Sequence, residues 1–303
     1  MSVDVIKDMG HSVNARLKSL AGQRRVSFDY LLLRYAYERF LFRLGRSQQS
    51  SRFILKGACA FSVWFGPMFR VTRDTDFLCH GNPAPEQLAQ CFRDICATEV
   101  LNDGVRFDTD SIVTSEIKKD ARYRGTRVVF NARIQNARVT LQFDVGFGEC
   151  VYPDAVIEEY PRLLDSFPSP CILVYPRCTV VAEKFEAIVS LGMLNSRVKD
   201  YFDIWLLSEN FDFDYPVLSQ AIEGTFMRRG SDLPDGRPVG LTKEYSQDAM
   251  KLSQWSAFIR KVSPLRKPAS LQECVERIAS FLHPFLCVGE AAPVKWEAGK
   301  RWQ

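Results

Sequence analysis

Two aspartates separated by one residue are the first candidates for chemistry in this sequence. Asp74 and Asp76 lie in the stretch Phe69 to Leu78, which has the apolar content of a strand. Because successive side chains of a strand point to opposite faces, Thr72 would share one face with both aspartates. Two carboxylates about 7 Å apart repel each other unless a cation lies between them. Such oxygen ligands suit Mg²⁺, which binds one or two carboxylates together with substrate phosphates.

A third carboxylate is predicted on a neighbouring strand. Residues 126–147 alternate apolar and polar side chains before and after Asn136, which predicts a β-hairpin with one buried face. Asp144 falls on the polar face of this hairpin. Three acids on adjacent strands can hold metal ions that stabilise the attacking and leaving oxygens of a phosphoryl displacement. An Asp-x-Asp pair alone is common on surface strands, so this interpretation depends on the surrounding elements.

The segment upstream of the aspartates predicts a phosphate-binding turn. An apolar run, Arg52 to Lys56, ends at Gly57, and a second run from Ala58 to Phe65 follows. This order predicts a strand, a tight turn and a helix. Exposed amides at a helix N-terminus can bind triphosphate oxygens, and glycine permits a close backbone approach. Gly57 could also be an ordinary turn glycine. The aspartates downstream favour the interpretation of a phosphate-binding turn.

A lysine and two aspartates form a third cluster, in a region that is helical in pattern from about residue 176. On a helix, Lys184 shares a face with apolar side chains, so it either extends to the rim or points into a site between domains. Asp200 and Asp203 are one turn apart on the next helix and could pair with Lys184 or Arg197. For Asp203, a salt bridge between helices is at least as plausible as chemistry.

Two domains would position these residues. Residues 12–50 are apolar at helical spacing, and residues 86–101 predict an amphipathic helix between the acidic strand and the hairpin. The proline-bearing stretch at 167–170 predicts the junction. We therefore expect a first domain of residues 1–170, in which helices and strands are mixed, and a helical second domain of residues 171–303.

The composition is that of a folded globular protein. The 303 residues are 46% hydrophobic and 25% charged, which permits a sizeable core. A run of about 18 apolar residues is missing, so we expect no membrane span, and the polar N-terminus predicts no signal peptide. Nine cysteines without a CxxC pair favour reduced thiols, and three dispersed histidines without metal-ligand spacing argue against a structural zinc site. We expect a cytoplasmic protein.

The net charge of +4 is unevenly distributed. Basic side chains outnumber acidic ones in residues 224–303, and they cluster between residues 118 and 138. Such clusters can attract phosphates or nucleic acid, although a solvated strand face and a soluble tail are the more usual explanation. The basic residues between positions 118 and 138 are Lys118, Lys119, Arg122, Arg124, Arg127, Arg133 and Arg138.

Several of these motifs, taken in order, resemble the AbiEii/AbiGii-type toxins, which are DNA polymerase β-like nucleotidyltransferases. The likeness spans roughly residues 50–265. The similar segments are Leu55–Ala58, Arg70–Phe77, Leu141–Val145, Ala182–Ala187, Arg197–Asp203, Phe226–Gly230, Leu233–Pro234 and Leu241–Thr242. The resemblance implies an α+β fold: a polymerase β-like nucleotidyltransferase domain, with a mixed sheet flanked by helices and an N-terminal helical extension, followed by a mainly helical C-terminal domain.

The resemblance also implies roles for individual residues. Asp74 and Asp76 would hold Mg²⁺ or Mn²⁺ and through it the nucleoside triphosphate (NTP). Asp144 would be the third metal-binding and catalytic acid, placed to orient or deprotonate an attacking hydroxyl. Lys184 would neutralise phosphates, and Asp200 would complete the catalytic set. The implied nucleotide-binding residues are Lys56, Gly57, Ala58, Arg70, Thr72, Lys184 and Asp203.

Two positions depart from the family pattern. Ala58 stands where Gly or Ser is usual, so a hydroxyl that could bind phosphate is missing while the backbone donor remains. Asp144 stands where Glu is frequent, and its shorter side chain requires a slightly different strand position.

The expected function is transfer of a nucleoside monophosphate from an NTP to an RNA acceptor, with tRNA as the first choice. The resemblance places this activity in a toxin–antitoxin or phage-defence system, with a cognate antitoxin encoded nearby. Two alternatives remain: a nucleotidyltransferase acting on a small molecule or a protein side chain, and a catalytically inactive module that binds a partner protein or RNA. Ala58 is the main argument for the inactive module.

Overall fold

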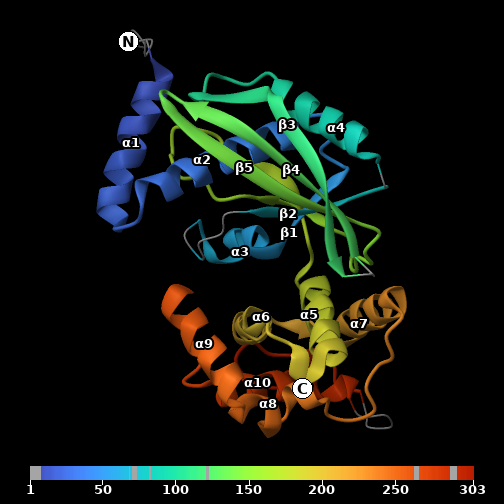
Figure 1. Cartoon of the computed structure of the whole chain (residues 1–303). Helices are drawn as coiled ribbons and strands as arrows, with labels where there is room; N and C mark the ends of the chain where they lie inside the picture. The colour runs from blue at the N-terminus through green and yellow to red at the C-terminus, as the bar shows by residue number, and fades with distance from the viewer. Residues whose placement is uncertain are drawn as a thin grey trace. The chain divides into compact units, whose positions relative to one another are not determined.

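The structure, a computed structural model, describes residues 8–67, 69, 74–81, 83–120, 123–262, 266–286 and 292–303, without the side chains of 118–120, 123 and 124. It consists of two compact units (Figure 1). The first contains residues up to Gly148 together with Val156–Val174, and the second contains Glu149–Ala155 together with Tyr175–Gln303. The predicted boundary at residue 170 stays a prediction; residues 171–174 belong to the sheet of the first unit.

A mixed sheet forms the centre of the first unit. Its strands, in the described residues, follow the order β3-β4-β5-β2-β1-β7-β6. Two neighbouring pairs, β1–β7 and β2–β5, are parallel, and the others are antiparallel. The strands are β1 (Phe53–Lys56), β2 (Thr75–Cys79), β3 (Val105–Asp120), β4 (Tyr123–Ile134), β5 (Ala137–Phe147), β6 (Val156–Glu159) and β7 (Cys171–Val174).

Two helices supply aromatic side chains to one face of this sheet. Phe40 of α2 and Phe92 of α4 pack against Phe130 of β4 and Phe143 of β5. All four rings are fully buried, and each contributes about 2–3 kcal/mol through its removal from water. This face is the apolar side of the predicted hairpin, so the polar side faces the other way. The helices of the unit are α1 (Met9–Arg24), α2 (Phe28–Arg46), α3 (Gly57–Phe65) and α4 (Pro85–Ala97).

Helix α2 also carries buried charges that fix the loops around the sheet. Arg43 binds both carboxylate oxygens of Asp103, at 2.7 and 3.1 Å. Glu38 accepts a hydrogen bond from Arg39 at 2.6 Å and another from the backbone N–H of Leu163 at 2.7 Å. Burial raises the pKa of Glu38 to about 7, although Arg39 opposes this shift. The helix therefore binds two connections between strands as well as the sheet.

The second unit is mainly helical. Phe185 packs on Phe226, and the rings of Tyr201 and Tyr245 stack with their centroids 4.6 Å apart. Gly230 ends one helix in the left-handed conformation, which glycine adopts without steric cost. The helices are α5 (Arg177–Leu191), α6 (Val198–Asn210), α7 (Tyr215–Arg229), α8 (Lys243–Gln247), α9 (Ala249–Val262) and α10 (Leu271–Leu282), and β8 (Phe213–Asp214) pairs with β9 (Lys295–Trp296).

The expected fold class is confirmed: a mixed sheet flanked by helices precedes a helical C-terminal region. The strand–turn–helix unit at 53–65 and the hairpin of β4 and β5 also form as predicted. The predicted strand from Phe69 to Leu78 was too long, because Phe69 and Asp74 are described and lie outside β2, which begins at Thr75. Residues 70–73 lie outside the described residues. Among the described helices, none has the length and apolarity needed to span a membrane.

Candidate active site

Strand register brings four charged residues into one line across the sheet. Lys56 is opposite Asp76, Asp76 is opposite Asp144, and Asp144 is opposite Arg127. Partners in register on neighbouring strands project their side chains from the same face, and the strands lie about 4.8 Å apart. We call Lys56, Asp76, Asp144 and Arg127 the charged row. It places two acids side by side between two bases, on the face opposite the aromatic core.

The two acids come together because β2 and β5 run parallel in register. Like charges directly opposite each other destabilise a sheet, so Asp76 and Asp144 require compensation. Arg127 provides part of it by donating from Nε and Nη2 to the two Asp144 oxygens, at 2.8 and 2.9 Å. The Asp144 side chain is 5% exposed and that of Arg127 is 37% exposed. Solvent therefore reaches the arginine but hardly the carboxylate.

The pKa of Arg127 is raised, first by its hydrogen bonds to Asp144 and further by the charges of Asp144, Asp74 and Asp76, while its limited burial opposes the shift. All three predicted acids therefore act electrostatically on one guanidinium. Arg127 was not predicted as a site residue, although the hairpin contained the signal. The turn pairs Ile134 with Ala137, and counting outward from that pair gives Arg127 opposite Asp144.

Asp74 lies just before β2 and is half-buried. Thr75, between the two aspartates, is fully buried, which agrees with the predicted alternation. The Cys59 thiol is 3.3 Å from Thr75 Oγ1 and 3.6 Å from the Asp74 carbonyl oxygen, so α3 contacts the start of the strand directly. Arg70 and Thr72, both predicted to bind nucleotide, lie outside the described residues.

The predicted glycine turn lies against Asp76. Gly57 has φ +65°, a left-handed conformation that favours glycine, and Lys56 is the N-cap of α3. A Cβ at position 57 would lie 2.8 Å from Asp76 Cγ and would overlap its carboxylate. The positive end of the α3 dipole is therefore close to a site acid. Ala58 follows within the first turn of α3 and is half-buried.

A buried arginine of α2 holds α3 in place. The Arg34 side chain donates to Ser62 Oγ at 3.2 Å and to the Pro67 carbonyl at 3.3 Å, and it contacts the Cys59 sulfur at 3.7 Å. Arg34 is only 2% exposed. It therefore ties the helix next to Asp76 to the connection that leads to Asp74. Sequence reasoning missed this residue because an arginine in an amphipathic helix normally lies on its solvated side.

In the second unit, Lys184 lies between two carboxylates. Its Nζ is 2.6 Å from Asp200 Oδ1 and 3.0 Å from Asp203 Oδ2. Lys184 and Arg197 were the two predicted partners of these aspartates. Both aspartates bind Lys184, whereas Arg197 is exposed. Burial alone lowers the pKa of Lys184, but the two carboxylates outweigh it and raise the pKa. We call these three residues the lysine triad.

The donor set of the first unit fits a divalent cation bound together with a nucleotide. Asp76 and Asp144 supply hard carboxylate oxygens from neighbouring strands in register, and one or two carboxylates plus phosphate oxygens is the usual Mg²⁺ environment. In the described part of the chain, no three His, Cys, Asp or Glu side chains are gathered as a metal-binding group. The three-ligand set of Asp74, Asp76 and Asp144 therefore stays a prediction.

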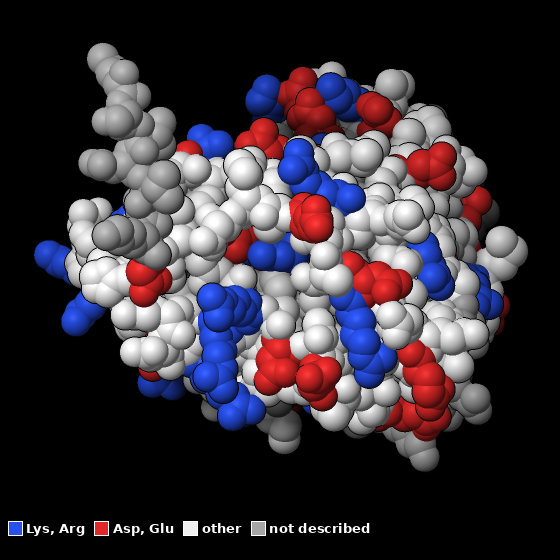
Figure 2. Space-filling view, turned by 90° about the horizontal axis from the view of Figure 1, so that it is seen from above, with Lys and Arg blue, Asp and Glu red and all other residues white. Residues whose placement is uncertain are grey.

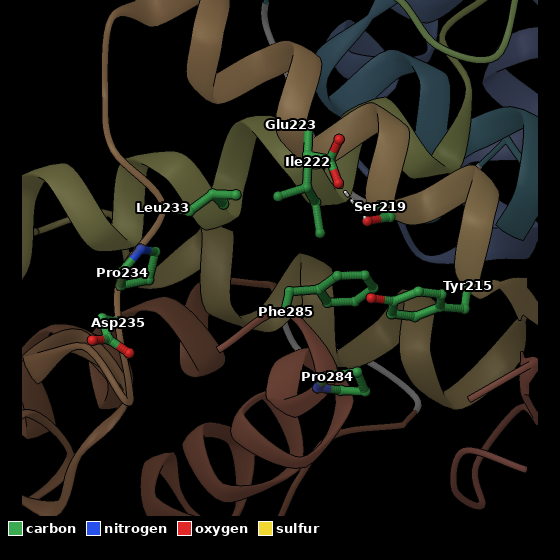
Figure 3. A pocket seen from close by; sticks show the side chains of 9 residues that line it. All are labelled: Tyr215, Ser219, Ile222, Glu223, Leu233, Pro234, Asp235, Pro284 and Phe285. Atoms are coloured by element: carbon green, nitrogen blue, oxygen red, sulfur yellow. Dashed lines mark hydrogen bonds between the residues drawn. The ribbon is translucent and has the colours of Figure 1, made fainter. Parts of the chain in front are cut away.

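A pocket of about 210 Å³ lies elsewhere in the second unit (Figure 3). The rings of Tyr215 and Phe285 stack along one side, and its charged lining residues are Glu223 and Asp235. None of the predicted site residues lines it. Two acids and no base make this pocket a poor site for a triphosphate.

Comparison with known proteins identifies the family. The sequence profile of the family described as "Nucleotidyl transferase AbiEii toxin, Type IV TA system" matches residues 39–277. A crystal structure of JHP933 from Helicobacter pylori has a TM-score of 0.50 at 14% identity, covering 86% of this chain and 93% of that chain. A candidate nucleotidyltransferase from the same organism has a TM-score of 0.49 at 14% identity, covering 86% and 96%.

No curated protein matches the sequence. At 14% identity the JHP933 structure supports the fold alone. The family match extends from α2 to α10 and includes both the charged row and the lysine triad. The chain belongs to the AbiEii nucleotidyltransferase toxin family of type IV toxin–antitoxin systems.

Proposed function

We propose that this protein transfers a nucleoside monophosphate from an NTP to a hydroxyl group of an RNA acceptor, with tRNA as the expected class. Nucleotidyltransferases use an NTP and a divalent metal in general, and a type IV family implies an antitoxin partner. The observation that carries the proposal is the in-register pair of Asp76 and Asp144 beside the Gly57 turn of α3. We assign the reaction to the cytoplasm.

The acids and the arginine of the charged row have tasks in this reaction, together with Asp74 and the Gly57 turn. Asp74 and Asp76 would hold Mg²⁺ or Mn²⁺, which when bound supplies charge stabilisation to the triphosphate oxygens. Asp144 accepts the proton of the attacking hydroxyl or orients it, and Arg127 keeps the Asp144 carboxylate in a fixed orientation. The backbone N–H groups at Gly57 and Ala58 bind phosphate oxygens at the N-terminus of α3.

The proposed roles in the second unit are electrostatic. Lys184 neutralises phosphate charge, and the two carboxylates of Asp200 and Asp203 fix its position. Arg70 and Thr72 keep their proposed nucleotide-binding roles. The basic side chains of β4 and β5 support an RNA acceptor, because clustered positive charge attracts a phosphate backbone.

A labelling experiment tests the proposal directly. The protein is incubated with each α-labelled NTP, Mg²⁺ and total tRNA, and the products are separated by size with and without ribonuclease. We expect ribonuclease-sensitive label with the wild type and none with Asp76→Asn. Label that survives ribonuclease would indicate a small-molecule or protein acceptor.

The inactive-module alternative has its own test. Growth arrest on expression is compared for the wild type and for Asp76→Asn, each alone and with the adjacent antitoxin gene. A catalytic toxin loses the arrest with the substitution. Arrest that persists in Asp76→Asn, together with absence of label transfer by the wild type, would establish a binding module instead.

A further inference from the structure

Three arginines form a second line across the sheet, at the far end of the hairpin. Arg106 of β3 is opposite Arg133 of β4, and Arg133 is opposite Arg138 of β5. All three are exposed. Because partners in register share a face, their side chains project from the same side of the sheet. The row spans two strand spacings, about 10 Å from Arg106 to Arg138. We call these residues the arginine row.

This arrangement is unfavourable for the protein by itself. Like charges directly opposite each other on neighbouring strands repel, and here two such pairs share Arg133. Within the described residues, none of the three arginines has an ion-pair partner. On the face seen in Figure 2, groups of Lys and Arg side chains lie beside groups of Asp and Glu. A bound anion would relieve the repulsion within the arginine row.

The arginine row lies on the same face of the sheet as the charged row. Arg138 and Asp144 are both on β5 and are separated by an even number of residues, so they project to the same side. Their separation is about 20 Å, from a rise of about 3.3 Å per residue. Between them the face carries Thr140, which is hydrogen-bonded to Asn131 at 3.0 Å, and the cross-strand pair of Val113 and Val129. In Figure 1 this face is turned to the viewer and α2 lies behind the strands.

We infer that the arginine row binds backbone phosphates of the acceptor RNA, about 20 Å from the hydroxyl that reacts at the charged row. This inference rests on the proposed function and adds where the acceptor is held. At about 3.4 Å per nucleotide of a stacked strand, the distance corresponds to roughly six nucleotides. Guanidinium groups bind phosphates through paired N–H donors, and three positive charges in a line match a phosphate backbone.

Direct binding is the first test, because it does not require catalysis. Affinity of the full-length protein for a 24-nucleotide RNA is measured by fluorescence anisotropy at several salt concentrations. We expect the triple variant Arg106→Gln, Arg133→Gln, Arg138→Gln to bind roughly 10- to 100-fold more weakly at 0.1 M salt. The slope of log K against log salt should fall by about 2, since each lost phosphate contact removes about 0.7 for a single strand.

Two matched variants separate this effect from net charge and from folding. Lys18→Gln, Arg24→Gln, Arg25→Gln removes three exposed bases from α1 and its C-cap and should leave affinity within about twofold. The triple Arg→Lys variant of the arginine row keeps the charge and should keep most of the salt slope. Equal weakening by the α1 variant and the row variant would overturn the inference, and so would a wild type that binds no RNA.

Acceptor length is the second test and distinguishes this inference from the proposed function. A trinucleotide spans about 10 Å and cannot join the two rows. We expect the triple Gln variant to raise KM for a 24-nucleotide acceptor by at least tenfold, with unchanged KM for NTP and unchanged transfer to a trinucleotide of the same 3′ sequence. Equal KM values for wild type and variant on the long acceptor would overturn the inference that the arginine row binds the acceptor, and would leave the proposed function intact. Binding that depends on the row without any label transfer would overturn the proposed function alone.

Discussion

The charged row and the lysine triad both bring carboxylates to a base, but they differ in construction and in solvent access. In the charged row, register between strands far apart in sequence aligns Asp76 with Asp144, and Arg127, the base that binds Asp144, is 37% exposed. In the lysine triad, helical spacing aligns Asp200 with Asp203, and Lys184 is 17% exposed. An accessible base can exchange partners at low cost, whereas a buried one cannot. The charged row is thus built for binding and the lysine triad for rigidity.

The proposed role of Lys184 must be compatible with the contacts that this side chain already makes. Its Nζ already contacts two carboxylates, so binding a phosphate adds an interaction to an existing pair. The lysine is held in position before any nucleotide arrives. Loss of this side chain should therefore affect stability at least as strongly as it affects catalysis.

The largest expected effect is on the stability of the lysine triad. Lys184→Met leaves two buried carboxylates without a base, and we expect the free energy of unfolding of the second unit to fall by about 3–5 kcal/mol. Urea unfolding followed by tryptophan fluorescence measures this, because Trp205, Trp255, Trp296 and Trp302 all lie in that unit. Lys199→Met is the control, since Lys199 is exposed on α6, and it should change stability by less than about 0.5 kcal/mol. A Lys184→Met protein as stable as the wild type would contradict the conclusion that the lysine triad serves rigidity.

The next effect is on activity at the charged row. Asp76→Asn removes a proposed metal ligand and should lower the transfer rate about 100- to 1000-fold, with little change in the unfolding of the first unit. Initial rates at saturating NTP and Mg²⁺ provide the measurement. Asp165→Asn, in an exposed loop of the same unit, should retain wild-type rates. Comparable rates for the two variants would contradict the assignment of the site.

A smaller effect is expected from the backbone next to Asp76. Gly57→Ala introduces a Cβ into the Asp76 carboxylate and a side chain at φ +65°, so we expect a loss of about 1–3 kcal/mol of stability together with weaker NTP binding. Thermal unfolding and the KM for NTP are measured together. Gly22→Ala, a helical position with open space around it, should be neutral or slightly stabilising. A Gly57→Ala protein that behaves like Gly22→Ala would remove the argument for a required glycine.

The smallest effect distinguishes an accessible base from a buried one. Arg127→Gln should reduce transfer about tenfold, because the Asp144 carboxylate is no longer held in one orientation. Stability should fall by about 1–2 kcal/mol, less than in Lys184→Met, because one carboxylate instead of two loses its base and the glutamine amide can still donate a hydrogen bond to it. Arg127→Lys should recover part of the rate but not all, because an ammonium cannot bind both oxygens in the same way. A stability loss equal to that of Lys184→Met would erase the difference between the two clusters.

Local patterns predicted much of this structure from the sequence. The hairpin of β4 and β5 follows from strict alternation, and the strand–turn–helix unit at Gly57 follows from an apolar run interrupted by glycine. Strand β3 was missed because residues 108–111 interrupt its alternation with consecutive polar side chains, at the register shift after Asp108. Helix α2 was predicted, but its burial was not, because Arg34, Glu38, Arg39 and Arg43 are charges that pairing allows into the core.

The candidate site was predictable only in part, because its geometry depends on long-range pairing. Alternation of side chains predicted that Asp74 and Asp76 share one face of their segment. In the hairpin it predicted that Asp144 lies on the polar face. The parallel register that sets Asp76 against Asp144 joins strands separated by α4 and the long β3–β4 hairpin, so no local pattern encodes it. Arg34 reaches the site through three-dimensional packing of α2 on α3, which sequence spacing does not report.

The parallel register of β2 and β5 also determines where this protein can accept insertions. Side chains alternate with a period of two, so one extra residue within β2 or β5 would turn the site acids toward the aromatic core and bring Phe77 or Phe143 to the outer face. The tight turn at Gln135 and Asn136, by contrast, lies beyond the last paired residues and about 20 Å or more from the acids. Length changes in this family should therefore accumulate in turns of that kind and be excluded from the two short segments that carry the carboxylates.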